Sequence, residues 1–151
     1  MKIVNLIEVP HHLETLARWH QKEWSYLRPN KTLTERIDRM KSHLMAEFIP
    51  TTFVATNHEL LGSAAIIKHD MYTRKELTPW LASVYVAPEF RRRGIGSALV
   101  FHIMEQAREN KIERLYLFTP DREAFYTRLG WKTFEKTSYL GYMVKIMHVD
   151  L

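Results

Sequence analysis

The chain has 151 residues, a length that fits one domain with a substantial buried core. Its 22 lysines and arginines exceed its 17 aspartates and glutamates, and the resulting net charge of +5 favours an anionic ligand. The sequence contains no cysteine, which excludes a disulfide framework, a thiolate nucleophile and a cysteine-based metal site.

The sequence also predicts where the protein works. No segment approaches the roughly 18 to 20 uninterrupted apolar residues that a membrane span requires. The first ten residues lack the cleavage site of a secretion signal. Because a chain without cysteine suits a reducing compartment, we expect a cytoplasmic protein with no membrane partner.

The N-terminal third of the chain predicts one strand and two helices. Residues 2–8 have the pattern of a strand that ends before Pro10. Apolar residues at helical spacing predict a helix over about 12–25 and a second one from Leu33, with an apolar stripe that reaches Phe48. The second helix follows the sequence TLTE, which has the form of a capping box.

The middle and the end of the chain alternate between strands and helices. A hairpin is predicted from its two apolar runs and the polar turn between them, and a loop and a further strand follow it. Pro120 and Asp121 are typical of a helix start, and Gly130 is typical of a helix end. The predicted elements are strands at 51–56, 60–68 and 80–88, a helix of about four turns from Gly94, a strand at 114–119, a helix at 120–130, and strands at 131–136 and 140–151.

These elements predict a single α/β (α+β) domain over residues 1–151. The strand before Pro88, the helix from Gly94 and the strand at 114–119 form a β-α-β unit, so these two strands should be parallel. Short turns join the other strands, which predicts a mixed central sheet.

The stretch VYVAPEFRRRGIGSALV, residues 84–100, predicts an anion site. A helix that starts directly after a strand leaves its first amide groups without partners, and these amides together with the helix dipole attract a phosphate. Gly94 and Gly96 allow a close approach to the backbone, and Arg91, Arg92 and Arg93 supply positive charge. The stretch fits neither the P-loop pattern nor the dinucleotide-binding glycine pattern.

Arg91-x-x-Gly94-x-Gly96 closely resembles the acetyl-CoA signature of the GNAT superfamily of acyltransferases, Gln/Arg-x-x-Gly-x-Gly/Ala. The segment REAFYTRLGW (122–131) resembles a second motif of that family, Ala-x-x-Phe-Tyr-x-x-x-Gly-Phe. The order of strands and helices is also similar along the whole chain. The resemblance implies an N-acyltransferase fold with about seven strands and four helices, in which the fourth and fifth strands splay apart at a bulge.

The resemblance also implies a site for acetyl-CoA as co-substrate. Tyr126 would protonate the departing CoA thiolate, an acceptor amine would attack the thioester directly, and a main-chain amide of the fourth strand would polarise its carbonyl. Thr119 stands where the family often has an asparagine that contacts the cofactor. The residues implied in cofactor binding are Val84, Tyr85, Val86, Arg91, Arg92, Arg93, Gly94, Ile95, Gly96, Ser97 and Thr119.

The sequence leaves the general base and the acceptor open. Some family members carry a glutamate on the fourth strand, but PWLASVYV contains no carboxylate. By position, the candidates for the base are His69, Asp70, Glu76 and Tyr85, and solvent water could serve instead. The missing carboxylate also leaves open an inactive acyl-CoA-binding sensor as the alternative function.

A looser resemblance concerns the acceptor. LYLFTPDREAFYTRLGW, WHQKEW and the last strand are similar to the branch that acetylates acidic actin N-termini, although a small amine fits equally well. Trp24 and Trp80 are candidates for an acceptor pocket, but large aromatic residues at such spacing usually belong to the core.

The sequence also bears on three further kinds of partner: metal ions, nucleic acid and a second copy of the chain. The eight histidines show no metal-ligand spacing, so no metal is expected. The basic cluster is local and lacks a nucleic-acid-binding motif, so no nucleic acid is expected. The sequence leaves open whether the chain forms a homodimer through its last strands or its helices.

Overall fold

Seven strands form one mixed sheet in the computed structural model, which describes residues 1–151. The sheet order is β1-β2-β3-β4-β5-β7-β6, and β4 and β5 are its one parallel pair. This confirms the predicted α/β domain with a mixed sheet. The strands are β1 (Lys2–Asn5), β2 (Thr51–Thr56), β3 (Leu60–Ile67), β4 (Trp80–Val86), β5 (Arg114–Thr119), β6 (Lys132–Tyr139) and β7 (Tyr142–Asp150).

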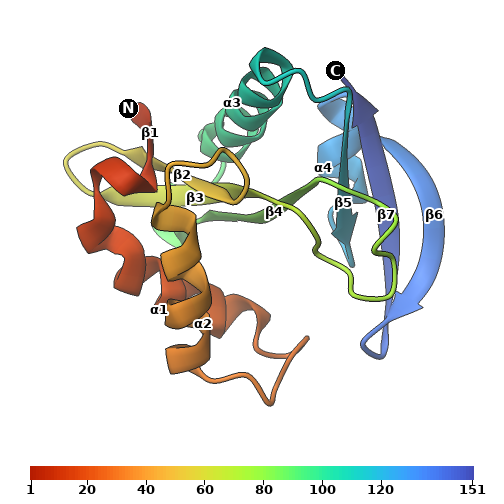
Figure 1. Cartoon of the computed structure of the whole chain (residues 1–151), viewed down its shortest axis with the longest axis horizontal. Coiled ribbons are helices and arrows are strands. Elements are labelled where there is room, and N and C mark those ends of the chain that lie inside the picture. Colours follow the sequence, from red (N-terminus) through yellow and green to blue (C-terminus); the bar gives the residue numbers. More distant parts are fainter.

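Helices cover both faces of this sheet. The helices α1 and α2 lie on one side of the sheet and α3 lies on the other, where it connects β4 to β5 (Figure 1). None of the helices combines the length and the apolar composition that crossing a membrane would require. The helices are α1 (Leu13–Trp24), α2 (Leu33–Lys41), α3 (Ile95–Glu109) and α4 (Glu123–Arg128), and short 3-10 turns occupy Leu6–Glu8, Pro10–His12, Ser42–Leu44 and Pro88–Phe90.

Strand β2 shows how the sheet separates two cores. Successive side chains of a strand point to opposite faces. Phe53 and Ala55 therefore pack into the core beneath α3, whereas Val54 packs with Leu16 and Met40 of α1 and α2. A third cluster forms where the loop after β3 packs against β6 and β7.

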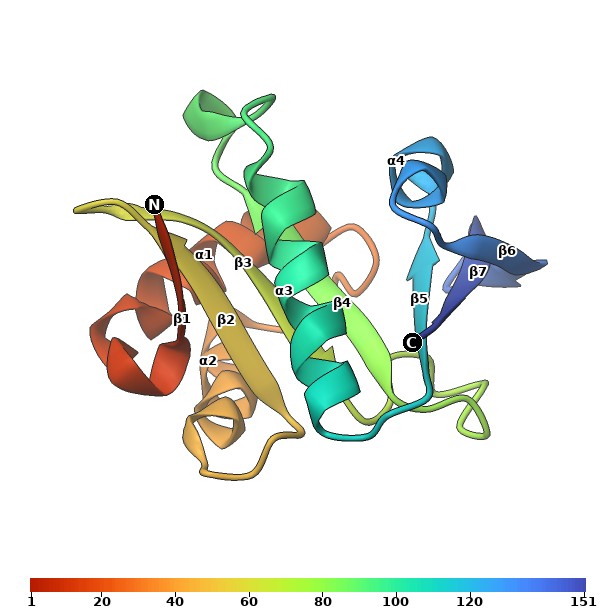
Figure 2. The same ribbon diagram turned by 90° about the horizontal axis from the view of Figure 1, so that it is seen from above.

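Strands β4 and β5 meet at one end and then diverge (Figure 2). Their one paired position is Trp80 with Tyr116, although each strand continues for several more residues. Between Ala82 and Tyr85, β4 contains one residue more than the facing segment of β3, which is a β-bulge. The bulge residue Ser83 has a φ of 53°. The splayed strands expected from the family resemblance are thus present.

Several predicted boundaries were right. The hairpin of β2 and β3, the helix that begins after Gly94, and α1 all lie where the sequence placed them. The capping box is also present: the Thr32 hydroxyl accepts from the Glu35 amide, and the Glu35 carboxylate accepts from the Thr32 amide.

Other predicted boundaries were too long. The first strand ends at Asn5, because its side chain accepts a hydrogen bond from the Ile7 amide and starts a 3-10 turn. The second helix ends at Lys41 and does not continue to Phe48. The fourth helix begins at Glu123, because the Thr119 hydroxyl accepts from the Arg122 amide and holds the intervening residues in a turn.

The chain end forms a tight hairpin. Strand β6 runs to Tyr139, three residues further than predicted. Leu140 and Gly141 alone form the turn, and both have positive φ values, 53° and 85°. Such a pair is typical of the two-residue loops that suit the twist of a β-hairpin.

Gly62 lies where β3 approaches β4 most closely, so its replacement tests the packing of the two strands. A Cβ at Gly62 would stand 2.4 Å from the Tyr85 carbonyl oxygen, and backbone cannot move aside cheaply. We expect Gly62→Ala to destabilise the protein by about 1–3 kcal/mol, measured as a lower midpoint of thermal unfolding. In the matched control Gly96→Ala, the new Cβ would meet Phe125 at an ordinary 3.5 Å, and stability should be kept or increased. Equal effects of the two changes would contradict this account.

Candidate active site

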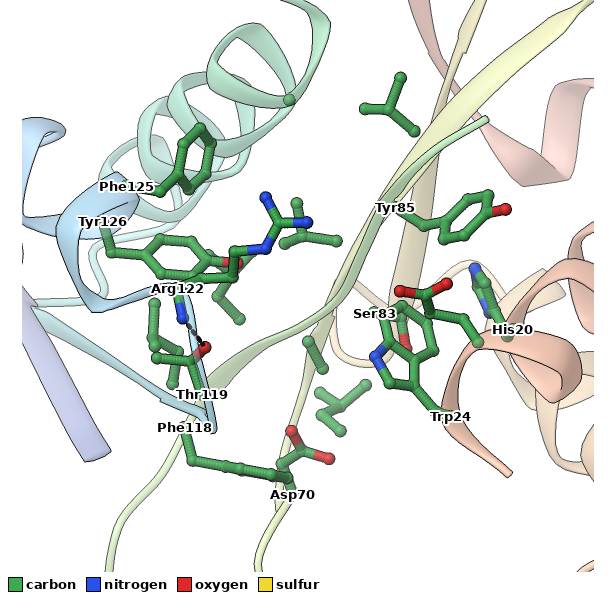
Figure 3. A pocket seen from close by; sticks show the side chains of 18 of the residues that line it. His20, Trp24, Asp70, Ser83, Tyr85, Phe118, Thr119, Arg122, Phe125 and Tyr126 are labelled. Atoms are coloured by element: carbon green, nitrogen blue, oxygen red, sulfur yellow. Dashed lines mark hydrogen bonds between the residues drawn. The ribbon is translucent and has the colours of Figure 1, made fainter. Parts of the chain in front are cut away.

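A cleft of about 1210 Å³ opens where β4 and β5 diverge. One wall comes from β5 and α4, which contribute Thr119 and Tyr126. Facing them across the cleft lie His20 and Trp24 of α1 and Tyr85 of β4 (Figure 3). The start of α3 and the loop after β3 complete the lining.

The edge of β4 supplies polar backbone groups to this cleft. Val84, Tyr85 and Val86 line it, and on their other side β4 pairs with β3. Beyond Trp80, no residue of β5 pairs with this edge, so its amides and carbonyls have no strand partner there. Such an edge can pair with an extended ligand as a neighbouring strand would.

The start of α3 forms an anion site at the far end of β4. Gly94 is the N-cap of the helix and has a φ of 80°, in the left-handed region that glycine adopts readily. Ile95, Gly96 and Ser97 occupy the first turn, where amides have no acceptor within the helix, and all three line the cleft. This end of the cleft therefore suits a phosphate.

The three consecutive arginines take different positions. Arg91 lines the cleft and is held in place, because its Nε donates to the Val86 carbonyl at 2.8 Å and its guanidinium lies 5.4 Å from the centre of the Tyr85 ring. Arg92 also lines the cleft. Arg93 is exposed and stacks over Phe90. It does not line the cleft, although the sequence analysis included it in the site.

Tyr126 and Thr119 lie on the opposite wall. Tyr126 is 9% exposed, and its hydroxyl makes no hydrogen bond within the protein. Burial raises the pKa of Tyr126 above its ordinary value, so the phenol keeps its proton at neutral pH. The Thr119 hydroxyl accepts from the Arg122 amide at 2.9 Å, which leaves its own hydrogen available for a ligand.

A buried hydrogen-bonded chain holds the bulge of β4. The Ser63 hydroxyl donates to the Ser83 carbonyl at 3.1 Å, and Nε2 of His20 lies 2.9 Å from the same hydroxyl. Burial, with smaller contributions from nearby cations, lowers the pKa of His20 to about 3. The neutral imidazole therefore donates from Nε2 to Ser63, and the chain joins α1, β3 and β4.

The two tryptophans predicted as candidates for the acceptor pocket lie in different surroundings. Trp24 lines the cleft, close to the rings of His20 and Tyr85. Trp80 is fully buried among Met71, Tyr139 and other residues of the third cluster, and it does not line the cleft. Its indole donates to the Leu77 carbonyl within that cluster. Trp80 is thus a core residue, and its assignment to the acceptor pocket was wrong.

The four candidates for the base also lie in different surroundings. Glu76 lies outside the cleft in an exposed ion pair with Arg74. Burial raises the pKa of Tyr85, which leaves this phenol protonated at neutral pH. His69 and Asp70 both line the cleft, and burial raises the pKa of Asp70 to about 6 although Arg28 and Arg39 oppose the shift. No group of three or more histidine or acidic side chains is placed to hold a metal ion.

Several basic residues that line the cleft were not predicted from the sequence. Arg36 lies on the apolar stripe of α2, three residues after Leu33 and four before Met40. A charged residue on such a stripe was the available signal, because it must be buried or reach into a cavity. The missed lining residues are Arg28, Arg36, Arg39, His43 and Lys68.

A cleft between splayed parallel strands, with the first amides of a helix at one end, suits an extended, phosphate-bearing ligand. A model of the acetyltransferase (GNAT) family matches residues 13–131. The chain therefore belongs to the GNAT family of acetyltransferases. A search of curated proteins found no match.

Solved structures of acetyltransferases share the fold over nearly the whole chain. An aminoglycoside 6'-N-acetyltransferase complexed with coenzyme A is 16% identical, with a TM-score of 0.76 over 99% of this chain and 97% of that one. A ribosomal-protein-alanine N-acetyltransferase from Brucella melitensis is 19% identical, with a TM-score of 0.75 and full coverage of both chains. At these identities the likeness establishes the fold.

Ser63→Ala tests the hydrogen-bonded chain at the bulge. The change leaves the Ser83 carbonyl and Nε2 of His20 without their partner in a buried place. We expect a loss of about 1–3 kcal/mol in the free energy of unfolding, measured by urea denaturation. Ser138→Ala, at an exposed position of β6, is the control and should change stability by less than about 0.5 kcal/mol. A Ser63 variant as stable as this control would show that the chain does not hold the bulge.

Proposed function

We propose that the protein is an acetyl-CoA-dependent N-acetyltransferase that acts on a primary amine, either a small amine or a peptide N-terminus. One observation carries the proposal: a single cleft contains the unpaired edge of β4, the first amides of α3 and the Tyr126 hydroxyl. In this proposal the main chain of Val84 to Val86 pairs with the pantetheine arm. The amides from Arg92 to Ser97 bind the pyrophosphate.

The proposed reaction needs no covalent enzyme intermediate. The amine nitrogen attacks the thioester carbonyl carbon, and a C–N bond forms. The C–S bond then breaks, its electron pair leaves with sulfur, and Tyr126 donates a proton to the thiolate. The nitrogen loses its extra proton to Asp70. Because the chain has no cysteine, an acyl-cysteine cannot form.

The related structures support amine acetylation and leave the acceptor open. Two of them are named for their acceptors, an aminoglycoside and a ribosomal-protein alanine. Since both share this fold at similar TM-scores, the acceptor has to be inferred from the side chains of the cleft.

Tyr126→Phe tests the proposed general acid. Loss of the hydroxyl should lower kcat by about 10²- to 10⁴-fold, while the affinity for CoA, measured by calorimetry, stays within about twofold of the wild type because the proposed pyrophosphate and pantetheine contacts remain. Turnover is measured as thiol release from acetyl-CoA over a panel of amines and peptides. The matched control is Tyr72→Phe, at an exposed tyrosine outside the cleft, and it should be fully active.

Two outcomes would contradict this assignment. Full activity of the Tyr126 variant would mean that Tyr126 only packs in the core. If the wild type binds acetyl-CoA, seen as a rise in melting temperature, but releases no thiol with any acceptor, the protein is instead an acyl-CoA-binding sensor.

Asp70→Asn tests the proposed base through the pH dependence of the rate. Burial raises the pKa of Asp70 to about 6, so the carboxylate is protonated and inactive below this pH and deprotonated and active above it. We expect the wild-type kcat to rise through about pH 6. The variant should lack this rise and be slower by about 10²-fold or more at pH 7.5.

The control for this measurement is Asp38→Asn. Asp38 is an exposed residue of α2 that pairs with Lys41 outside the cleft, so the variant should keep the wild-type profile. An Asp70 variant with the wild-type rate and profile would show that water or another group accepts the proton.

A further inference from the structure

The acceptor side of the cleft has a positively charged wall. We use the name cationic wall for Arg28, Arg36, Arg39 and Lys68, which line the cleft from the segment between α1 and α2, from α2 and from the loop after β3. None of the four takes part in an ion pair within the chain, since every salt bridge of the structure involves other residues. The carboxylates that act on them are Asp70, near Arg28 and Arg39, and Glu35, near Arg39, so the four cations outnumber these anions.

Arg36 is the most constrained member of the cationic wall. It is only 7% exposed, and the one hydrogen bond of its side chain runs from Nε to the Gln21 side chain at 2.9 Å. Its two Nη groups donate to no protein atom. Only Trp131 and His148 have a side-chain nitrogen that is fully buried and lacks a hydrogen-bond partner. The Nη groups of Arg36 are therefore not sealed in the core, and they open to the cleft that Arg36 lines.

The neighbours of Arg36 increase the cost of this arrangement. Burial, together with the nearby Arg39 and Arg28, lowers the pKa of Arg36 to about 10. Burial and Arg28 also lower the pKa of Arg39, although Asp70 and Glu35 oppose this shift. Positive charges that are close together and partly removed from water are destabilising unless an anion compensates them. A bound anion would supply this compensation.

This wall is distinct from the anion site at the start of α3. Arg28 donates to the main-chain carbonyl of Asp70, which follows β3 closely. Ile67, the last residue of β3, pairs with Trp80 at the N-terminal end of β4, so Arg28 lies near that end. The start of α3 follows the other end, after Val86. A seven-residue strand spans about 20 Å. A phosphate bound at α3 is therefore too far away to neutralise Arg28.

We propose that the cationic wall binds a carboxylate carried by the acceptor, so that the protein acetylates amines that bear an acidic group. The inference rests on the proposed function and specifies its acceptor. The planar guanidinium groups of Arg36 and Arg39 can each bind a carboxylate through two parallel hydrogen bonds. Asp70, a carboxylate on the same side of the cleft, is left for the amine end of the acceptor. A dicarboxylic amino acid and an acidic peptide N-terminus both carry this chemistry.

The proposal is tested by binding to the CoA-loaded protein, which cannot turn over. Two matched probe pairs are used in calorimetry: free aspartate against asparagine, and a peptide beginning Asp-Asp-Asp against one beginning Asn-Asn-Asn. We expect at least one acidic probe to bind about tenfold or more tightly than its neutral partner. Preference for free aspartate or for the acidic peptide identifies the source of the carboxylate.

Variants link the preference to the wall. Arg39→Gln should weaken binding of the acidic probe about tenfold and leave the neutral probe unchanged. Arg36→Gln should do the same, and Arg36→Lys should restore only part of the affinity because it cannot form the paired contact. Arg39 is exposed, so its variant tests the proposal even if a change at the buried Arg36 impairs folding. The control is Arg18→Gln, an exposed residue of α1 that pairs with Glu14 outside the cleft.

The outcomes separate the two proposals. Equal binding of acidic and neutral probes, or an equal loss for both in the Arg39 variant, overturns the carboxylate subsite. If neutral amines are then acetylated with thiol release, the proposed function stands. Absence of an acetyl-CoA thermal shift and of thiol release with every acceptor would instead overturn the proposed function.

Discussion

The separation of β4 from β5 is the constraint on which the rest of the site depends. Had the two parallel strands stayed in register, their amides and carbonyls would be paired with each other and the space between them filled with side chains. The bulge at Ser83 turns β4 away after one paired position, and Ser63 holds the carbonyl that the bulge leaves without a strand partner. The free edge, the helix start and Tyr126 can then share one cleft.

The sequence correctly placed the strand and the helix start at one end of this cleft because these elements are local. Strand, turn, glycine and helix start follow one another within residues 84–100, so their order along the chain is also their order in space. Within this stretch, Arg93 is the exception, because it was predicted in the site and does not line the cleft. Which of three adjacent arginines faces the cleft depends on the turn, in which Arg92 has a φ of 65°. Composition and spacing carry no information on this point.

The side of the cleft that carries Asp70 and the cationic wall was poorly predicted because it is assembled from distant segments. Asp70 lies in the cleft through the path of the loop after β3, and Trp80 is buried because that loop and the last hairpin close over it. Neither event leaves a periodic signal in the sequence. Arg36 did leave one, a charge on the apolar face of α2, but it takes on a meaning only when the cleft beside it is known.

The two sides of the cleft are nevertheless mechanically connected. His20 of α1 donates to Ser63, which donates to the bulge of β4, so the helix next to the cationic wall also fixes the strand proposed to hold the donor. Helix α2 has no such connection: Arg36 reaches α1 through Gln21 alone, and Arg39 has no side-chain hydrogen bond. If the cationic wall binds the acceptor as proposed, changes on α2 alter which acceptor is recognised without moving β4, because the proposed recognition and the strand geometry depend on different hydrogen bonds.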